Sequence, residues 1–532
     1  MRSLPGWCGL LLAGLAQAGS LAWPFDWGWP HGEPLAGLQL LSLAALVGSL
    51  WRAPDARAAL ARGWVWATAW LAGTFWWLYV SMHTYGGLSA PLAVLGVLAL
   101  AALLALFYAL AAMLAWRWRD AALGVRLAVF AALWTLAELA RGTLLTGFPW
   151  GAGGYALIDG LAPLAPWIGV YGLGAVGAAL AVPLAETLLA ISSPRVAATG
   201  IFPDWRAVAG VLVLLPALFW PGIGRYWAGV TPDWTVATGR LPVTLLQGNI
   251  PQDEKFQPGS GVAVALAWYG EQARAALARD RAGLVIAPET AIPLLPRDID
   301  PAYWNGLMHA VARGRSALML GQPLGSLEQG YTNSVTSWMP GGAAMHRYDK
   351  QHLVPFGEFI PPLFRWFTDL MQIPLGDFSR GALVQPPLRW AGQRIGPDIC
   401  YEDLFGEELA RGFADPAQAP TVLVNLSNIG WFGDTLAIAQ HRQIARMRAL
   451  ELQRPMLRAT NTGATMAIDH RGRISAELPR LTRGTLDVEV EGRDGLTPYA
   501  RWAGRFGLWP LALLGVAVLL ALWRRTSAAR RP

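Results

Sequence analysis

The chain is poor in charged residues, in lysine and in cysteine. Only 14% of its 532 residues are charged, whereas 54% are hydrophobic. Because soluble proteins carry about 25% charged residues, this deficit excludes an ordinary soluble enzyme and indicates an integral membrane protein with a polar portion. The net charge of +7 could suggest nucleic acid as a partner, but the arginines flank apolar segments, where they set membrane topology. We therefore expect no nucleic-acid partner.

The chain has two lysines, Lys255 and Lys350, and two cysteines, Cys8 and Cys400. A chain that uses arginine almost everywhere else keeps lysine by chance or where a compact, titratable ammonium matters. Lys255 lies in a polar loop, which favours chance, whereas the sequence motif around Lys350 favours a function. Cys8 lies in an apolar run, and we expect it to serve packing.

Apolar runs of membrane length recur through the first half of the chain, and one more lies near its C-terminal end. We expect eight spans, at residues 6–23, 34–51, 64–82, 88–115, 122–140, 161–191, 206–221 and 506–523. Arginines follow alternate runs, so the positive-inside rule predicts cytoplasmic termini and puts residues 222–505 in the periplasm of a bacterial inner membrane. No second cysteine lies on that oxidising side, so an internal structural disulfide is not expected.

Residues 240–490 alternate strand and helix signals, which predicts an inserted α/β domain. Buried strands are expected at 241–247, 284–287, 317–320, 421–425 and 456–459, and amphipathic helices at 262–279 and 436–454. The predicted domains are a transmembrane domain of seven spans (1–221), a catalytic domain (222–505), and a final transmembrane helix with a basic tail (506–532).

Three polar segments supply groups for covalent acyl chemistry. Cys400 lies between a strand-like stretch (393–399) and a helix-like stretch (404–410), a turn that favours a thiolate, although an inert buried cysteine is the alternative. Glu289 follows a strand and a proline, and is either a solvated loop residue or a general base. Lys350 either pairs with a neighbouring carboxylate at the surface or stabilises an oxyanion.

Other reaction classes find no support in the sequence. No Gly-x-Ser-x-Gly elbow is present, the seven histidines form no ligand-spaced cluster, and no phosphate-binding glycine loop opens a helix. We therefore expect neither a metal nor a cofactor.

Together, the segments around these three residues resemble the Glu-Lys-Cys triad of the nitrilase superfamily. Further segments resemble its membrane-bound branch, the apolipoprotein N-acyltransferases: Gln-Gly-Asn-Ile-Pro-Gln (247–252), Leu-Val-Pro-Phe-Gly-Glu (353–358), Phe-Ser-Arg-Gly (378–381), Asn-Ile-Gly-Trp-Phe-Gly-Asp (428–434), residues 440–451, and Thr-Gly-Phe-Pro-Trp (146–150). The resemblance covers nearly the whole chain. It implies an α/β fold, an αββα nitrilase-like sandwich inserted in an all-α, eight-helix transmembrane domain.

The resemblance implies transfer of an acyl chain from a phospholipid, with phosphatidylethanolamine expected as the donor, to the N-terminal α-amino group of a diacylglyceryl-cysteine apolipoprotein. This is the last step of lipoprotein maturation. Cys400 would carry the acyl chain as a thioester, Glu289 would be the general base, and Lys350 would stabilise the oxyanion in a ping-pong cycle. The alternatives are a membrane-tethered nitrilase-like amidase, and a transporter or lipid-binding protein with an inactive domain, which the intact triad opposes. We expect a monomer.

The resemblance also implies residues around the triad. Supporting positions match Glu358, Tyr401, Glu402 and, less closely, Asn333, while substrate-binding positions match Trp431, Phe148 and Phe256. Many family members have tryptophan at position 256, so ring stacking survives here but an indole N–H bond does not.

Two apolar segments are expected to serve the lipid substrates, which leave a bilayer at a cost of about 0.8 kcal/mol per buried methylene. The stretch 359–378 is interpreted as a lid that dips into the outer leaflet, with ordinary core as the alternative. Loop 142–157, which holds five glycines, is expected to be exposed and to line the substrate cavity.

Overall fold

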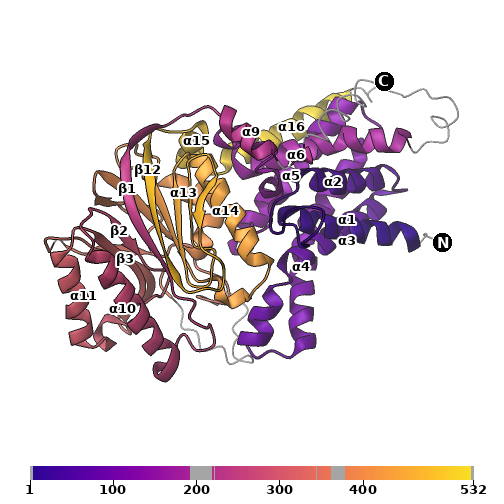
Figure 1. The fold of residues 1–532 in the computed structure, drawn as a ribbon. Coiled ribbons are helices and arrows are strands. Elements are labelled where there is room, and N and C mark those ends of the chain that lie inside the picture. Colours follow the sequence, from indigo (N-terminus) through magenta and orange to yellow (C-terminus); the bar gives the residue numbers. More distant parts are fainter. Residues whose placement is uncertain (1–3, 192–217, 221, 343, 361–377, 529–532) are drawn as a thin grey trace. The chain divides into compact units, whose positions relative to one another are not determined.

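The structure is a computed structural model, and it describes residues 4–191, 218–220, 222–342, 344–360 and 378–528 (Figure 1). The chain divides into two compact units. The helical unit comprises Met1–Tyr79, Ala90–Thr231 and Leu508–Pro532, and the sandwich unit comprises Val80–Ser89 and Pro232–Gly507. The short segment Val80–Ser89, which links two long helices, thus belongs to the sandwich unit.

Seven of the predicted spans overlap helices of the helical unit, although the span predicted at 64–82 runs beyond the end of α3 at Phe75. The predicted span 206–221 lies almost entirely outside the described residues. The helices are α1 (Leu4–Leu21), α2 (Ala36–Trp51), α3 (Ala56–Phe75), α4 (Ala90–Ala115), α5 (Leu123–Thr143), α6 (Ala165–Ile191) and α16 (Trp509–Ala528), with the short α9 (Ile223–Val230) beside them in the sequence.

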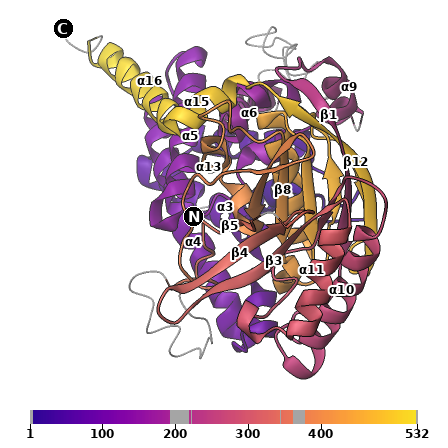
Figure 2. The ribbon, with the colours of Figure 1, turned by 90° about the vertical axis from the view of Figure 1, so that its left-hand side faces the viewer.

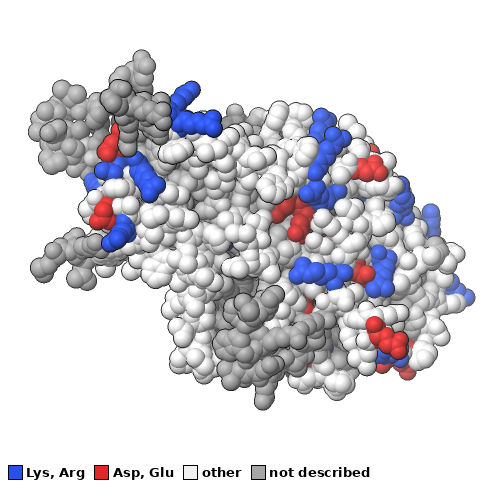
Figure 3. Space-filling view, turned by 180° about the vertical axis from the view of Figure 1, so that it is seen from behind, with Lys and Arg blue, Asp and Glu red and all other residues white. Residues whose placement is uncertain are grey.

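The predicted count of eight spans is not confirmed. Among the described residues three helices, Ala90–Trp118, Leu123–Thr146 and Ala162–Ile191, are long and apolar enough to cross a membrane. The pair Pro498–Phe506 and Trp509–Arg525, bent by 89°, makes a fourth if it is one span. For α2 the physical reason is length, because about 20 helical residues are needed to cross the hydrocarbon core and α2 has 16. Helix α3 has 20 residues, but it is not apolar enough. On the face seen in Figure 3, most of the helical unit's surface carries no charged side chain, as a lipid-facing surface requires.

The interior of the helical unit is built from small residues and stacked indoles. A Cβ on Gly63 of α3 would lie 2.5 Å from that of Ala112 of α4, so glycine is what lets these helices approach. Trp70 of α3 stacks on Trp134 of α5, with ring centroids 5.6 Å apart. Cys8 is exposed on α1, so the prediction that it serves packing is wrong.

The prediction that loop 142–157 is exposed is also wrong for most of its length. Only its first residues are exposed, with Leu145 74% accessible, whereas Trp150 is 3% exposed. The buried Arg141 holds the loop in place, because its guanidinium donates to the backbone oxygens of Phe148 (2.5 Å) and Trp150 (2.8 Å). A loop backbone can be buried only when its polar groups find such partners.

The sandwich unit contains two mixed six-stranded sheets, in the orders β12-β1-β2-β3-β4-β5 and β11-β10-β9-β8-β7-β6. The first sheet consists of β1 (Val236–Gln247), β2 (Leu284–Ile286), β3 (Ala317–Ser326), β4 (Gly330–Trp338), β5 (His346–Asp349) and β12 (Gly484–Asp494). The second consists of β6 (Leu388–Trp390), β7 (Gln393–Ile399), β8 (Val422–Ser427), β9 (Met456–Thr460), β10 (Met466–Ile468) and β11 (Ile474–Glu477). Strands β1, β2 and β3 are parallel neighbours, as are β7, β8 and β9.

The alternation of side chains along each strand separates two apolar layers. Val243 and Leu245 of β1 belong to the core between the sheets, which Val424 of β8 joins from the other side. Leu246 faces the opposite way and packs with α10 (Ala263–Leu277) and α11 (Pro301–Arg313). Helices α13 (Gly406–Arg411) and α14 (Leu436–Leu452) lie on the second sheet (Figures 1 and 2). The predicted sandwich of two sheets between helices is confirmed.

The predicted strands and helices of this unit are observed within a few residues, as β1, β2, β3, β8, β9, α10 and α14. Sequence reasoning did not find β4, β5, β6, β10, β11, β12 or α11. Strand β12, for instance, exists because it pairs antiparallel with β1, from Val236–Asp494 to Gln247–Gly484.

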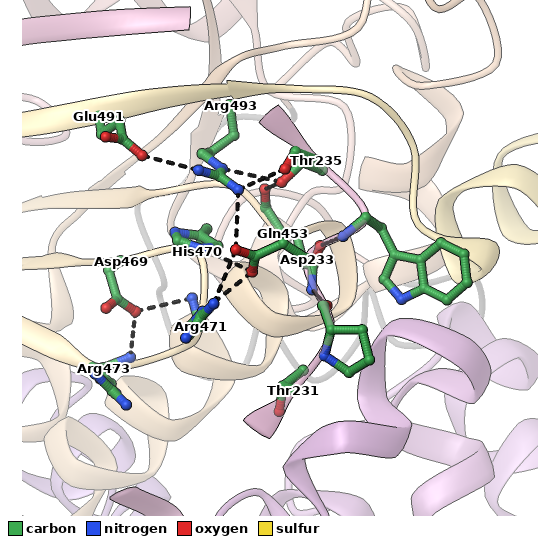
Figure 4. A network of polar contacts seen from close by, with 12 residues as sticks. Thr231, Asp233, Thr235, Gln453, Asp469, His470, Arg471, Arg473, Glu491 and Arg493 are labelled. Carbon is green, nitrogen blue, oxygen red and sulfur yellow. Dashed lines mark hydrogen bonds and ion pairs between the residues drawn. The ribbon is translucent and has the colours of Figure 1, made fainter. Parts of the chain in front are cut away.

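A polar network fixes the segment that enters the sandwich unit, as Figure 4 shows. The Asp233 carboxylate accepts hydrogen bonds from Arg471 Nη2 (2.9 Å) and lies 3.2 Å from His470 Nε2. Arg493 of β12 donates to the Thr235 carbonyl at 2.6 Å. The Gln453 side-chain amide donates to the carbonyl of Pro232 and accepts from the backbone N–H of Trp234. Four distant segments are thereby joined at the start of β1.

Candidate active site

Glu289, Lys350 and Cys400 come from three loops that begin where β2, β5 and β7 end. Lys350 Nζ lies 3.3 Å from Glu289 Oε1 and 2.9 Å from Glu358 Oε1. Glu289 is 7% exposed and Lys350 1%. The charges of Glu289 and Lys350 both act on the Cys400 thiol. The structure therefore brings the three predicted residues together in one site, with Glu289 and Lys350 buried and Cys400 half-buried.

Cys400 occupies a strained turn between β7 and the short 3₁₀ helix Cys400–Leu404. Its φ of +54° lies in the left-handed region, which costs a residue with a Cβ of order 1–3 kcal/mol. Two contacts maintain the turn: the Asn425 amide donates to the Cys400 carbonyl (3.1 Å), and the Ile399 N–H donates to the Glu402 carboxylate (2.6 Å). The predicted strand-to-helix turn is confirmed.

The surroundings of Cys400 favour the protonated thiol over the thiolate that the sequence led us to expect. Burial raises its pKa to about 12, the neighbouring Glu289 carboxylate adds to the rise, and Lys350 opposes it. A sulfur nucleophile therefore forms here only when a base takes the proton as the reaction begins. Glu289 is the carboxylate whose charge acts most strongly on this thiol.

Glu289 is held by donors on both oxygens, so the alternative of a solvated loop residue is wrong. Oε1 accepts from the Asn333 amide at 2.7 Å and faces Lys350. Oε2 accepts from the backbone N–H of Asn428 at 2.8 Å. A carboxylate fixed in this way has a defined direction for accepting a proton.

Lys350 is a buried ammonium held between two carboxylates, which excludes the alternative of a surface ion pair. Burial alone would lower its pKa, but Glu289 and Glu358 outweigh that effect and raise the pKa above its ordinary value. Glu358 is itself fixed, since Oε1 also accepts from Asn333 (2.8 Å) and Oε2 from the Val354 N–H (2.8 Å). Lys350 therefore stays charged, as an oxyanion partner must.

Glu402 ties the segment after Lys350 to the turn that carries Cys400. Its Oε1 accepts from the N–H groups of Gln351 (2.7 Å) and His352 (3.2 Å), and its Oε2 from Tyr348 Oη (2.9 Å) and the Ile399 N–H (2.6 Å). Burial raises the pKa of Glu402 to about 7 against the opposing backbone hydrogen bonds. Its neighbour Tyr401 is 5% exposed and packs against Phe405.

Two residues at the site were not found from the sequence as participants. Asn428 contributes a backbone N–H, for which the side chain gives no signal. Lys255 was interpreted as a chance residue of a polar loop, but it is 1% exposed and donates from Nζ to the Glu289 carbonyl at 3.1 Å. The scarcity of lysine was the available signal, because both lysines of the chain are in this site.

The predicted substrate-binding residues do not form one cluster within a single unit. Trp431 is 36% exposed and stands edge-on to Tyr85 at 5.8 Å, and Phe256 is 52% exposed. Phe148 belongs to the helical unit, where its ring packs against Phe75 at 4.7 Å. Residues 361–377 of the predicted lid lie outside the described residues. Within the described chain, no group of three or more His, Cys, Asp and Glu side chains could hold a metal.

The two-sheet fold and the buried Glu-Lys-Cys site define a protein of the carbon–nitrogen hydrolase class, and the Carbon-nitrogen hydrolase family matches residues 243–497. A second family, the apolipoprotein N-acyltransferase N-terminal domain, matches residues 19–182.

Curated relatives extend this similarity over nearly the whole chain. The apolipoprotein N-acyltransferase of Verminephrobacter eiseniae is 55% identical over 513 residues, 94% of this chain and 92% of that one. Those of Ralstonia nicotianae and Bordetella bronchiseptica are 43% and 42% identical, covering 95% and 94% of this chain and 91% and 93% of theirs. The chain belongs to the apolipoprotein N-acyltransferase family.

Proposed function

We propose that the protein transfers an acyl chain from a phospholipid, through a thioester on Cys400, to the N-terminal α-amino group of a diacylglyceryl-cysteine apolipoprotein. The observation that carries the chemistry is the ammonium of Lys350, which lies between Glu289 and Glu358 and acts on the Cys400 thiol. The family gives the acceptor. Phosphatidylethanolamine is the proposed donor.

In the first half-reaction Glu289 takes the proton from Cys400, and the sulfur attacks the ester carbonyl of the phospholipid. The tetrahedral oxyanion that forms is stabilised by Lys350. When it collapses, the C–O bond breaks, Glu289 returns the proton to the departing alkoxide, and lysophospholipid leaves. Cys400 then holds the acyl chain as a thioester.

In the second half-reaction the α-amino group of the lipoprotein attacks the thioester and gives its proton to Glu289. Lys350 again faces the oxyanion. Collapse breaks the C–S bond, the amide is released, and the proton returns from Glu289 to the sulfur. The thiol of the resting enzyme, whose pKa burial raises to about 12, is thereby restored.

The remaining residues have proposed supporting roles. Asn333 and Glu358 orient the acid–base pair, Glu402 and Tyr401 maintain the nucleophile turn, and the substrates contact the aromatic residues Trp431, Phe256 and Phe148. The exposed rings of Trp431 and Phe256 support this assignment, since an exposed aromatic ring offers apolar area to a lipid.

The proposed setting is a bacterial inner membrane. Residues 1–221 and 506–532 are the membrane-embedded parts of a monomer with cytoplasmic termini, and residues 222–505 are the periplasmic catalytic domain. The apolar helices of the helical unit and the arginines that follow alternate apolar runs support this orientation.

Intact mass spectrometry of the purified enzyme after exposure to phospholipid vesicles tests the proposal. We expect a single acyl adduct on Cys400, stable until a diacylglyceryl-cysteine peptide is added and then discharged to it. The Cys400→Ala variant forms no adduct, whereas Cys8→Ala, which removes the other cysteine, behaves as wild type. Rapid discharge to water with release of free fatty acid would support the amidase instead. Absence of any adduct on Cys400 would overturn both.

A further inference from the structure

The second lysine of the chain lies beside the proposed catalytic groups. Lys255 is on the loop that follows β1, is 1% exposed, and donates from Nζ to the backbone carbonyl of Glu289 at 3.1 Å. Its charge interacts with the Glu289 carboxylate and with Cys400. Among the contacts of the described residues, the Glu289 carbonyl is the hydrogen-bond acceptor recorded for an ammonium that has three N–H groups to donate.

The two lysines have opposite environments. Lys350 has a carboxylate at 2.9 Å and another at 3.3 Å, whereas the recorded partner of Lys255 is a neutral carbonyl. Burial lowers the pKa of Lys255 to about 8, with Glu289 and Cys400 opposing the fall, while the pKa of Lys350 is raised. Burial of an ammonium that has no carboxylate partner is costly. A neutral side chain could hold the same carbonyl without that cost, so anchoring this loop does not by itself account for a lysine here.

The charges at the site favour a second cation. Around Lys350 two carboxylates, Glu289 and Glu358, face one ammonium. Proton transfer from Cys400 to Glu289 moves a negative charge onto sulfur and then onto the substrate oxygen without changing this total. Throughout, Lys350 remains bound to Glu358 and offers only part of its charge to the reacting atoms.

We propose that Lys255 is a second cationic residue of the active site. Its ammonium donates to the Glu289 carbonyl and stabilises the negative charge that develops on the Cys400 sulfur and on the oxyanion. Lys255 acts as a positioning and electrostatic residue through Glu289 and Cys400. The proposal rests on the proposed role of Cys400 as the nucleophile. The other charged groups of the site are Lys350 and Glu358, and the loop of Lys255 itself carries Asp253, which is exposed, and Glu254, which is half-buried.

Because both lysines of the chain are at the site, lysine-specific labelling reports on this proposal directly. Incorporation of [ε-¹³C]lysine gives two signals, and Lys255→Arg identifies the one that belongs to Lys255. We expect that signal to titrate near pH 8, the Lys350 signal to titrate only above the ordinary lysine pKa of 10.5, and Glu289→Gln to move the Lys255 titration to lower pH. Titration of Lys255 above pH 10, unmoved by Glu289→Gln, would overturn the proposal even if substitutions at position 255 failed to fold.

Kinetics of the nucleophile give the second test. In Lys255→Met, which keeps the chain length and loses the charge, we expect the first-order acylation of Cys400 to fall at least tenfold at pH 7. We also expect alkylation of Cys400 by iodoacetamide to need a pH at least one unit higher for the same rate. In the wild type we expect the acylation rate to fall above pH 8, because Lys255 then loses its charge. Lys255→Arg, which stays charged, should recover most of the acylation rate and should not show this fall.

Arg483→Met is the matched control. Arg483 also donates to a backbone carbonyl next to this loop, that of Gly248 at 2.8 Å, and its charge acts on Tyr269. It should leave the pH profile unchanged. If the wild type is acylated and Lys255→Met has the same rates and pH profile, this inference is overturned while the proposed function stands. Absence of acylation in the wild type would instead refute the proposed function.

Discussion

The Glu402 carboxylate offers the sharpest test of how the site is assembled. It is one side chain that accepts four hydrogen bonds, two from the segment after Lys350, one from Tyr348 and one from the Ile399 N–H before the nucleophile. The Glu402→Gln substitution keeps the shape and replaces one of the two acceptor oxygens by an NH₂ group. At least one pair of donors then faces another donor.

The cost follows from which pair is lost. If the amide nitrogen replaces Oε1, two backbone N–H groups, those of Gln351 and His352, lose their acceptor. If it replaces Oε2, the Tyr348 hydroxyl can rotate and accept, and only the Ile399 N–H is left without a partner. A buried unsatisfied N–H costs about 1–3 kcal/mol, so the cheaper orientation destabilises the fold by that amount at the turn of Cys400. Because misplacement of a reacting group by about 1 Å can cost about 10²-fold in rate, we expect acylation to fall by roughly that factor.

The rate of acyl-enzyme formation at pH 8, where the Glu402 carboxyl with its pKa of about 7 is ionised, measures the effect. The reaction is followed by quenched-flow mixing with phospholipid and intact mass spectrometry. The matched control is Glu408→Gln, because Glu408 contacts His352 Nδ1 at 3.1 Å from a more exposed position, and an amide oxygen can replace that contact. We expect less than a threefold change in the control. Acylation by Glu402→Gln within about threefold of wild type would refute the reasoning, since the four hydrogen bonds would then not determine where Cys400 lies.

Three further outcomes follow from the same geometry. Because burial raises the pKa of the Cys400 thiol to about 12, the thiol is protonated throughout the neutral range, and its alkylation by iodoacetamide should rise about tenfold per pH unit up to about pH 8, where Lys255 begins to lose its charge; a plateau already reached at pH 7 would contradict this. Asn333→Leu removes the amide that donates to both Glu289 and Glu358, at 2.7 and 2.8 Å, and should slow acylation about 10- to 100-fold, the equivalent of the 1.5–3 kcal/mol typical of a charged hydrogen bond; a rate equal to wild type would be inconsistent with its role. Burial alone would raise the pKa of Asp233, but the hydrogen bonds of its arginine and histidine neighbours outweigh that and hold it below 3.8, so the carboxylate contributes stability above pH 3.8 that is lost as the pH falls through the lowered value. In Asp233→Asn we therefore expect a lower melting temperature at pH 7, which corresponds to a loss of about 1 kcal/mol or less in the free energy of unfolding because the side chain is 34% exposed. The difference should shrink towards pH 3, and equal melting temperatures at pH 7 would contradict the reasoning.

Local patterns in the sequence predicted the parts of the fold that local forces build. The apolar runs gave seven helices, and the alternating segments gave the central strands β1, β2, β3, β8 and β9. Strand β12 escaped notice because more than 200 residues separate it from β1, its partner in the sheet. An apolar run in the sequence also does not show whether its helix is straight, as the bent pair Pro498–Phe506 and Trp509–Arg525 illustrates.

At the active site, the sequence by itself determined which reactive groups are available and that Cys400 follows a strand at a turn. The tertiary structure alone decided their chemical state. The thiol stays protonated because burial and Glu289 raise its pKa, and Lys350 stays charged because Glu289 and Glu358 face it. Lys255, which the sequence led us to interpret as a chance residue of a polar loop, is a buried neighbour of Glu289. The physical reason is that periodicity and propensity act between residues close in the chain, whereas burial and charge depend on residues that only folding brings together.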